Sequence, residues 1–339
     1  MLEGLRRERT IINPQADRVK EVAALARARI RAKKGLFLIE GPQGMREAVI
    51  SHARRPLLDA IYLTEEFLES SPEFESLLGL VTEKPTPEGR RVFLRLVTAP
   101  VLAAMADAQS PQGILGTASS AAVLPGRALG DADLLGGRPP AHQRDEDPAP
   151  RLLATLARIQ DPGNAGTLIR VADAAGAEAV LASSGSVDLL NPKTVRSTAG
   201  SMFHLGLRTG VELTETIRQA RAEGLQVLAA DGGGDLDLDE LSDAAARDRV
   251  AQAPLSQGVD LRRGTLWLFG NEAQGLTEAE KTQADARVAV PLYGQAESLN
   301  VGTAAAVCLY ASARAQRRLQ NPPSQNLSLP ADPASERSA

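Results

Sequence analysis

The chain contains 339 residues with a formal net charge of −4, and 43% of its residues are apolar. This length favours two domains, each with its own core, and the composition excludes a disordered acidic protein. The acidic average argues against binding nucleic acid over the whole surface, because phosphate-binding proteins usually show a basic footprint. The single cysteine, Cys308, excludes an intramolecular disulfide and a multi-cysteine zinc site, and its apolar neighbours favour a packed position in the last predicted helix.

Location and metal binding leave few signals in the sequence. No apolar run approaches the roughly 18 residues that a membrane span needs, and no export signal is present, so we expect a cytoplasmic protein. The three histidines, His52, His142 and His204, show no metal-ligand spacing, and we predict no metal site.

The first predicted element is an amphipathic helix over residues 19–30, because apolar positions recur there at helical spacing. The opposite side carries the basic residues Lys20, Arg27, Arg31 and Lys34. This basic face either meets RNA phosphates or is an ordinary solvated helix face, and the pattern alone leaves both open.

Strands and helices then alternate up to residue 118. We predict strands over residues 36–40, 59–63, 91–97 and 114–118, and helices over residues 42–52, 65–69 and 100–106. This alternation indicates a small α/β domain over residues 15–120. The next stretch is rich in proline and glycine and contains an acidic cluster, so residues 121–150 are predicted to be a linker.

The second half of the chain repeats the alternation. Predicted strands cover residues 152–159, 178–182, 226–230, 265–269 and 287–290, and predicted helices cover residues 165–175, 213–223 and 298–318, with a further helix after Asn191-Pro192. The pattern predicts a parallel sheet between helices, and therefore a second α/β domain over residues 151–319. Residues 320–339, rich in Pro, Ser and Asn, are predicted to be a disordered tail.

Three motifs place polar side chains at strand ends and helix starts, where open α/β sheets bind ligands. Residues 159–170 have the sequence IQDPGNAGTLIR, residues 266–276 have LWLFGNEAQGL, and residues 291–302 have PLYGQAESLNVG. A guanidinium stays protonated near neutral pH, so Arg170 suits the orientation and polarisation of a hydroxyl better than proton abstraction. Taken alone, each motif is also compatible with a structural turn.

In this order and spacing, the three motifs resemble those of the SpoU, or TrmH-like, RNA ribose 2'-O-methyltransferases of the SPOUT superfamily. The resemblance covers roughly residues 18–118 and 151–318. It implies an N-terminal RNA-binding domain similar to the ribosomal L30e fold and a C-terminal SPOUT domain with a deep trefoil knot. It also implies a homodimer with the cofactor pocket near the interface.

The resemblance assigns roles to individual residues. The residues expected at the catalytic centre are Arg170, Asn164, Glu272, Ser298 and Asn300. The residues expected to hold S-adenosylmethionine, largely through backbone groups, are Gly270, Val290 and Leu299. Arg170 falls on the position to which the family assigns activation of the ribose 2'-hydroxyl. Methyl transfer from a sulfonium to an oxygen needs no metal and no covalent intermediate.

We therefore predict an S-adenosylmethionine-dependent RNA 2'-O-methyltransferase that acts on 23S ribosomal RNA. One alternative is a transfer RNA 2'-O-methyltransferase, and another is a non-catalytic RNA-binding protein on the same scaffold. A nicotinamide-dependent oxidoreductase is disfavoured, because the glycines of residues 231–234 are expected to lead into an acidic loop over residues 235–239 and open no helix. Lys193 and Arg196 either meet RNA phosphates or are ordinary solvated charges.

Overall fold

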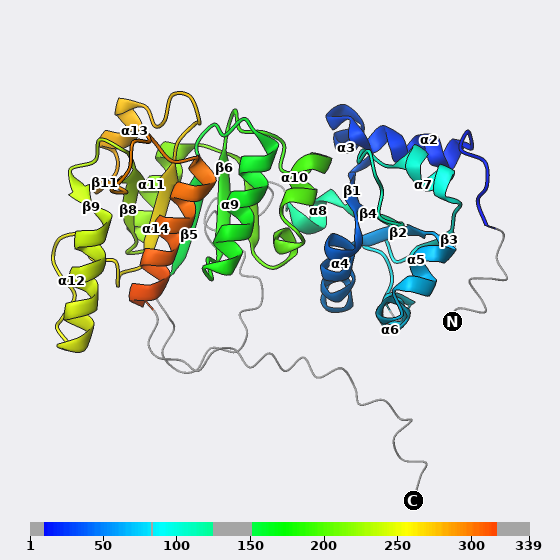
Figure 1. Cartoon of the computed structure of the whole chain (residues 1–339), viewed down its shortest axis with the longest axis horizontal. Helices are drawn as coiled ribbons and strands as arrows, with labels where there is room; N and C mark the ends of the chain where they lie inside the picture. Colours follow the sequence, from blue (N-terminus) through cyan, green and yellow to red (C-terminus); the bar gives the residue numbers. More distant parts are fainter. Residues whose placement is uncertain (1–9, 83, 125–150, 317–339) are drawn as a thin grey trace, which may run out of the picture.

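The computed structural model describes residues 10–82, 84–124 and 151–316. Two α/β units lie next to each other along the long axis of the molecule (Figure 1). We call residues 10–124 the N-terminal unit and residues 151–316 the C-terminal unit, since each contains its own sheet. Residues 125–150 of the predicted linker and the whole predicted tail lie outside the described residues.

The N-terminal unit contains a four-stranded mixed sheet in the order β1-β4-β2-β3. Strand β4 is antiparallel to both of its neighbours, whereas β2 and β3 are parallel. The strands are β1 (Leu36–Glu40), β2 (Leu58–Leu63), β3 (Phe93–Leu96) and β4 (Ile114–Ser119). The helices are α2 (Asp17–Ala23), the 3-10 helix η1 (Ala24–Ala26), α3 (Ala28–Lys34), α4 (Pro42–Arg54), α5 (Glu65–Ser70), α6 (Glu73–Thr82), α7 (Ala99–Met105) and α8 (Ser120–Val123).

The helix predicted over residues 19–30 is divided in two. Arg27 has φ −94° and ψ 127°, an extended conformation that ends η1 and precedes α3. The expected position of Arg31 on the basic outer face is wrong, because its side chain is buried. After the break, the guanidinium of Arg31 donates hydrogen bonds to the carbonyl oxygens of Leu25 and Ala26 at 2.9 and 2.8 Å.

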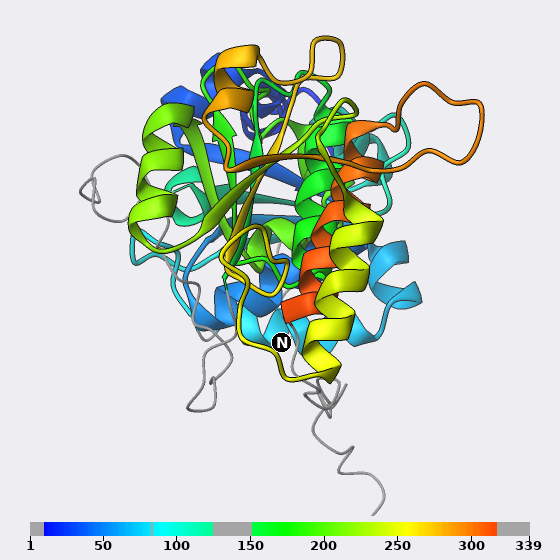
Figure 2. The same ribbon diagram turned by 90° about the vertical axis from the view of Figure 1, so that its left-hand side faces the viewer.

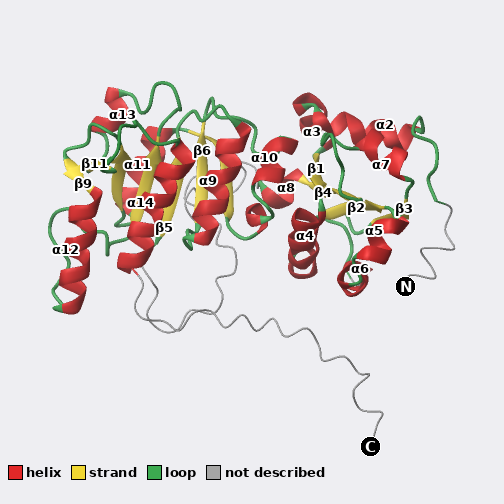
Figure 3. Ribbon diagram, in the orientation of Figure 1, coloured by secondary structure: helices red, strands yellow, loops and turns green. Residues whose placement is uncertain are grey.

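The C-terminal unit contains a seven-stranded parallel sheet, as predicted, in the order β7-β6-β5-β10-β8-β11-β9. The strands are β5 (Leu152–Leu156), β6 (Ala179–Ser183), β7 (Gly206–Val211), β8 (Gln226–Ala230), β9 (Leu236–Asp237), β10 (Thr265–Phe269) and β11 (Ala286–Ala289). The helices are α9 (Pro162–Ala174), α10 (Pro192–Ser197), η3 (Ser201–Phe203), α11 (Leu213–Ala222), α12 (Leu238–Val250), α13 (Glu278–Thr282) and α14 (Val301–Gln316). Figure 3 shows α9 and α14 in front of this sheet.

Alternate side chains of the parallel strands point to opposite faces of the sheet. On one face, Leu152 and Leu156 of β5 join the apolar cluster that also includes α9 and α14. On the other face, Leu153 joins a second cluster, which includes Leu213 of α11. Helices α9, α14 and α12 lie side by side on the first face (Figure 2). Helices therefore bury both faces of the sheet, as a parallel sheet requires.

Several parts of the C-terminal unit differ from the prediction: β7 and α13 were not predicted, and β5 ends at Leu156 instead of residue 159. The expected acidic loop over residues 235–239 is wrong, because α12 begins there. The carboxylate of Asp237 caps this helix by accepting the backbone N–H groups of Asp239 and Glu240 at 2.8 and 3.2 Å, and acidic residues suit the positive end of the helix dipole. Helix α14 begins at Val301 instead of residue 298, after Asn300 has capped it.

The apolar core is continuous between the two units. One cluster of buried side chains extends from Phe37 of β1 to Met202 of η3 and Leu309 of α14. Cys308 in α14 is fully buried, as expected, and burial raises the pKa of its thiol to about 12. In the described ranges, no helix combines the length and apolar character that crossing a bilayer requires.

Candidate active site

Three polar loops meet at one edge of the seven-stranded sheet. Strands β5 and β10 are parallel neighbours, so the residues after Leu156 and after Phe269 leave the sheet side by side. The third loop, residues 290–300, joins β11 to α14 and stands out from the body of the protein (Figure 2). The first two loops leave from the carboxyl ends of the strands, the position at which open α/β sheets bind ligands.

A hydrogen-bond network joins one residue from each loop. Nδ2 of Asn300 donates to Oδ1 of Asn164 at 3.0 Å, and Nδ2 of Asn164 donates to Oε1 of Glu272 at 3.0 Å. Glu272 also accepts the backbone N–H groups of Gln160 and Asp161, each at 3.2 Å. The structure thus brings together three of the five residues predicted at the catalytic centre.

Glu272 is held in its ionised form. Partial burial acts to raise the pKa of Glu272, but hydrogen bonds from the Asn164 side chain and from backbone N–H groups outweigh it, so the pKa lies below its usual range. An ionised carboxylate that already accepts these hydrogen bonds suits an anchor better than a proton carrier. Glu272 therefore fastens the second motif to the first.

The start of α9 is set by local capping. The carboxylate of Asp161 accepts the backbone N–H of Asn164 at 2.8 Å, and Pro162 occupies the first turn of the helix. This hydrogen bond is the main reason why the pKa of Asp161 lies below its usual value. Nζ of Lys193 lies 3.3 Å from the other oxygen of the same carboxylate. Asn164 is thereby placed in the first turn, facing the network.

Two glycines allow the loops to approach closely. At Gly302, an added Cβ would lie 3.0 Å from the methyl group of Thr167, so α14 starts in contact with α9. At Gly270, an added Cβ would lie 2.3 Å from the backbone carbon of Gly275, which would open the turn after β10. A side chain at either position would therefore move one of the loops that form the network.

Arg170 lies on the exposed face of α9, three residues beyond Thr167. Among the residues that the structure describes, no carboxylate lies within ion-pairing distance of its guanidinium. A planar cation with several free donors can engage a phosphate or a ribose oxygen. The charge of Arg170 is therefore available to a ligand that approaches the exposed face of α9, although Arg170 lies two turns beyond Asn164 and is not part of the network.

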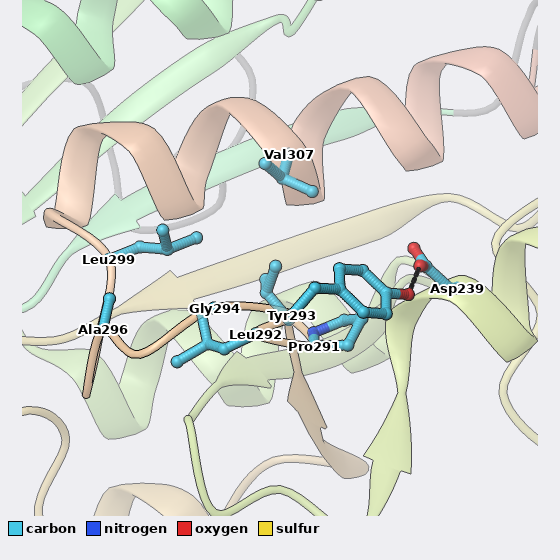
Figure 4. Close-up of a pocket in the computed structure, with 9 residues that line it drawn as sticks. Asp239, Pro291, Leu292, Tyr293, Gly294, Ala296, Leu299 and Val307 are labelled. Carbon is cyan, nitrogen blue, oxygen red and sulfur yellow. Dashed lines mark hydrogen bonds between the residues drawn. The ribbon is translucent and has the colours of Figure 1, made fainter.

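A cavity of about 390 Å³ lies between the 290–300 loop and α14 (Figure 4). Its lining is mostly apolar and includes Val290, Leu299 and Val307. Tyr293 forms part of the wall, and its hydroxyl donates a hydrogen bond to Oδ2 of Asp239 at 2.5 Å. Val290 and Leu299, two of the three residues predicted to hold the cofactor, therefore share one cavity.

Other predicted residues lie apart from these groups. Ser298 is exposed, and within the described part of the chain no hydrogen bond joins it to the network. Gly270 is buried in its turn and does not line the cavity. Arg196, for which RNA phosphates or solvent were the expected partners, forms ion pairs with Glu40 and Asp107 instead. Of the two candidate phosphate ligands, Lys193 alone keeps a mostly exposed side chain.

The sequence analysis missed several residues that shape the site. Asp161 had a local signal, because an aspartate before a proline often begins a helix. Asp239 and Tyr293 had none, since their hydrogen bond joins positions 54 residues apart. Over residues 10–82, 84–124 and 151–316, no three His, Cys, Asp or Glu side chains are arranged to hold a metal ion.

Two family models match this chain. Residues 151–310 match the SpoU rRNA Methylase family, and residues 16–116 match the MRM3-like substrate binding domain. Residues 151–310 make up nearly the whole C-terminal unit, so this unit belongs to the SpoU methylase family. This match, together with relatives that are 23S rRNA 2'-O-methyltransferases, confirms the prediction of an RNA 2'-O-methyltransferase. Among similar proteins, the 23S rRNA (guanosine(2553)-2'-O)-methyltransferase RlmP of Bacillus subtilis is 38% identical over 160 residues, which cover 47% of this chain and 57% of RlmP.

Solved structures with the same architecture cover nearly the whole chain. The crystal structure of an RNA 2'-O ribose methyltransferase has a TM-score of 0.66 and 26% sequence identity, and the match covers 91% of this chain and 99% of that one. The S-adenosylmethionine-bound rRNA methyltransferase of Sinorhizobium meliloti has a TM-score of 0.64 and 24% identity, over 90% and 97% of the two chains. These likenesses confirm the predicted α/β SPOUT architecture, and the trefoil knot stays a prediction.

Proposed function

We propose that this SpoU methylase transfers a methyl group from S-adenosylmethionine to the 2'-hydroxyl of a nucleotide in 23S ribosomal RNA. The observation that carries this proposal is the Asn164–Glu272–Asn300 network at the carboxyl edge of the sheet. Asn164 lies on α9, the same helix as Arg170, which has no carboxylate partner among the described residues. The relative RlmP supports ribosomal RNA as the substrate, since its name specifies 23S rRNA.

The cavity beside the 290–300 loop fits S-adenosylmethionine. Its volume of about 390 Å³ lies in the range of small-molecule sites, and its mostly apolar lining suits the faces of an adenine. Backbone groups come close from a neighbouring loop, because an added Cβ at Gly234 would lie 2.7 Å from the backbone nitrogen of Ala289. We propose that Val290 and Leu299 cover the adenosine, while Gly270 allows the turn after β10 to close on it. When bound, S-adenosylmethionine supplies an electrophilic methyl carbon.

Arg170 is proposed to bind the ribose 2'-hydroxyl and the neighbouring phosphate. The guanidinium would stabilise the negative charge that grows on the ribose oxygen as this oxygen attacks the methyl carbon, displaces S-adenosylhomocysteine and loses its proton to water. Asn164 and Asn300 would orient the nucleotide, with Ser298 as a further hydrogen-bond donor from the exposed loop. Glu272 is a positioning residue, because its oxygens are occupied by the network. Alignment of the two reacting atoms would supply much of the rate enhancement, and no step of this chemistry requires a metal.

The RNA is proposed to reach this site along α3 of the N-terminal unit. The exposed residues Arg27, Arg29, Lys33 and Lys34 lie in or next to this helix, and the buried Arg31 ties α3 to Asp188, in the loop after β6. Parallel strands end at one edge, so this loop opens on the same edge as the network. We propose residues 15–120 as the RNA-binding domain and residues 151–319 as the catalytic domain, joined by the linker of residues 121–150.

We also propose that the enzyme is a cytoplasmic homodimer. Apolar side chains that a monomer would leave in water gather around the cavity, namely Leu292, Tyr293, Val307 and, one turn further along α14, Tyr310. An exposed apolar patch of this kind often marks a protein interface, and most homo-oligomers pair the same patch across a two-fold axis. The molar mass in solution, measured for the native chain and for Tyr310→Glu, tests the proposal: a native monomer would contradict it.

The function is tested by transfer of labelled methyl groups from S-adenosylmethionine to separate pools of 23S ribosomal RNA and transfer RNA, both lacking prior modification. We expect label in the 23S pool, in a nucleoside that mass spectrometry identifies as 2'-O-methylated. Label in the transfer RNA pool alone would favour the alternative substrate. Binding of S-adenosylmethionine without transfer to either pool would contradict the proposed reaction.

A further inference from the structure

Charged side chains and an apolar centre join the two units. Figure 1 shows α10 of the C-terminal unit beside β1 of the N-terminal unit, and η3 packs against α4. The apolar centre belongs to the cluster that is continuous between the units. Three groups of charged contacts, at Arg31, Arg196 and His204, cross the same boundary, which we call the seam, and Oγ of Ser51 donates to the carbonyl of Phe203 across it at 3.3 Å.

Arg196, near the end of α10, binds two carboxylates of the N-terminal unit. Its guanidinium contacts Glu40 at the end of β1 and lies 2.9 Å from Oδ2 of Asp107. The side chain of Glu40 is only 5% exposed, and it also accepts the backbone N–H of Asp107 at 2.5 Å. Removal of the guanidinium would leave the Glu40 carboxylate buried without its cation, which is strongly unfavourable.

Arg31 forms the second contact, in which the cation belongs to the N-terminal unit and the carboxylate to the C-terminal unit. Its side chain is almost wholly buried in the N-terminal unit, and Nε donates to Oδ2 of Asp188 at 3.1 Å, with a second guanidinium nitrogen on the same oxygen. Asp188 lies in the loop after β6, on the edge of the sheet that carries the catalytic network. This pair therefore holds the basic helix α3 against that edge.

His204 forms the third contact and reaches the catalytic helix itself. Nδ1 lies 2.9 Å from Oδ2 of Asp173 in α9, and Nε2 lies 3.1 Å from Oε2 of Glu47 in α4. Asp173 is three residues beyond Arg170 along α9. The backbone of Gly200, with φ +96°, packs directly on Glu47, where an added Cβ would lie 2.6 Å from Cγ. No space for a side chain remains between the units at this point.

We propose that Arg31, Arg196 and His204 are positioning residues that hold the N-terminal unit in one orientation to α9 and so set where the bound RNA meets Arg170. This inference rests on the proposed function. Each contact ends on α9, on the loop after β6 or on α10, which itself packs against α9. Two domains of one chain usually move relative to each other unless their interface is large and apolar. The seam restricts that motion, and reacting groups displaced by about 1 Å can lose about 100-fold in rate.

Two variants of the full chain open the seam by different means. Arg196→Glu places a third carboxylate beside Glu40 and Asp107, and Glu40→Lys in the same chain restores one pair of opposite charges. Gly200→Ala acts sterically and changes no charge. Its matched control is Gly224→Ala, because Gly224 also has a positive φ, +77°, but nothing lies within 4 Å of an added Cβ.

Three quantities are measured for each variant: the distance distribution from small-angle X-ray scattering, the affinity for S-adenosylmethionine, and kcat and KM on unmodified 23S ribosomal RNA. For Arg196→Glu and Gly200→Ala we expect a longer maximum dimension, unchanged cofactor affinity and a loss in kcat/KM of about 10- to 100-fold, as for misplaced reactants. The double variant should recover most of the loss, and Gly224→Ala should behave as the native chain.

Two results would overturn the proposal. If the scattering of both seam variants matched that of the native chain, the three contacts would not hold the units together. If the units separated while kcat/KM stayed at the native value, their relative placement would be irrelevant to the reaction. A native chain that methylated neither RNA pool would contradict the proposed function instead, and the scattering data would still decide whether the seam holds.

Discussion

The catalytic edge and the seam use arginine in opposite ways. Arg170 at the edge is exposed and has no carboxylate partner among the described residues, whereas Arg196 at the seam is shared between two carboxylates. The two residues lie on helices that pack against each other, α9 and α10. The sequence analysis placed Arg170 at the catalytic centre through the resemblance, and it left Arg196 as either a ligand of RNA phosphates or a solvated charge.

The difference shows which charges are free to act on a substrate. A paired guanidinium would have to break its ion pair before it could bind a phosphate, and near a buried carboxylate that exchange is unfavourable. An unpaired guanidinium loses only its hydration. The network of Asn164, Glu272 and Asn300 contains no cation, and the seam keeps Arg31 and Arg196 occupied.

The largest effect is expected from Arg170→Ala. Loss of the only charge proposed to stabilise the ribose oxygen should lower kcat by about 10²- to 10³-fold, as for other preorganised donors. Binding of S-adenosylmethionine, measured by calorimetry, should change little. Arg170→Lys keeps the positive charge but loses the planar guanidinium, so its kcat should lie between those of the native chain and Arg170→Ala. Undiminished methyl transfer by Arg170→Ala would remove this residue from the mechanism.

A smaller loss is expected from Glu272→Ala. The substitution removes the acceptor for Asn164 and for two backbone N–H groups, so the turn after β10 should loosen and kcat/KM should fall by about 10- to 100-fold. The free energy of unfolding should fall by only about 1 kcal/mol, because water can reach the exposed donors. Glu69→Ala, at an exposed position on α5, is the control. Equal kinetics for both variants would mean that Glu272 does not position the site.

The sequence predicted local elements better than contacts between distant residues. Strands β1, β8 and β10 were predicted with their observed bounds, because short apolar runs between turn residues define them. The residues of the network were named through the resemblance, not through spacing, since Asn164 lies 108 positions from Glu272 and 136 from Asn300. Helix α12 was missed because its acidic start looked like a loop.

The seam could not be predicted at all. Arg31 pairs with a residue 157 positions away, and Arg196 with one 156 positions away, and neither partner has a local signal. Helical periodicity placed Arg31 on the outer face because the break at Arg27 is not visible in the pattern. A charge run thus indicates how many cations a surface can offer, and tertiary structure decides how many of them remain free.

Arg31→Ala tests the buried end of the seam. The variant leaves the carbonyl oxygens of Leu25 and Ala26 without their donor, so the free energy of unfolding should fall by about 1–3 kcal/mol. Arg29→Ala is the matched control, because Arg29 lies on the same helix but is exposed. It should leave stability unchanged and weaken RNA binding. If both variants unfolded at the same denaturant concentration, Arg31 would contribute nothing to the seam.

The smallest effect is expected from the titration of His204. Hydrogen bonds to Asp173 and then to Glu47 raise its pKa from 6.5 to about 9, against the opposing effect of burial. Since the folded pKa is the higher one, the stabilisation is fully present below pH 6.5 and is lost as the pH rises through about 9. Solvent screening reduces the stabilisation from the protonated His204, because its side chain is 39% exposed. Arg46 reduces it further, because it also forms an ion pair with Glu47.

The free energy of unfolding, measured between pH 6 and pH 10 for the native chain and for His204→Gln, isolates this contribution. The two curves should differ most at the acid end and converge at the alkaline end, because the neutral imidazole no longer binds both carboxylates as an ion. Parallel curves would mean that the histidine forms its hydrogen bonds without stabilising the seam. In that case Arg31 and Arg196 would be the charged contacts that stabilise the seam, together with its apolar centre.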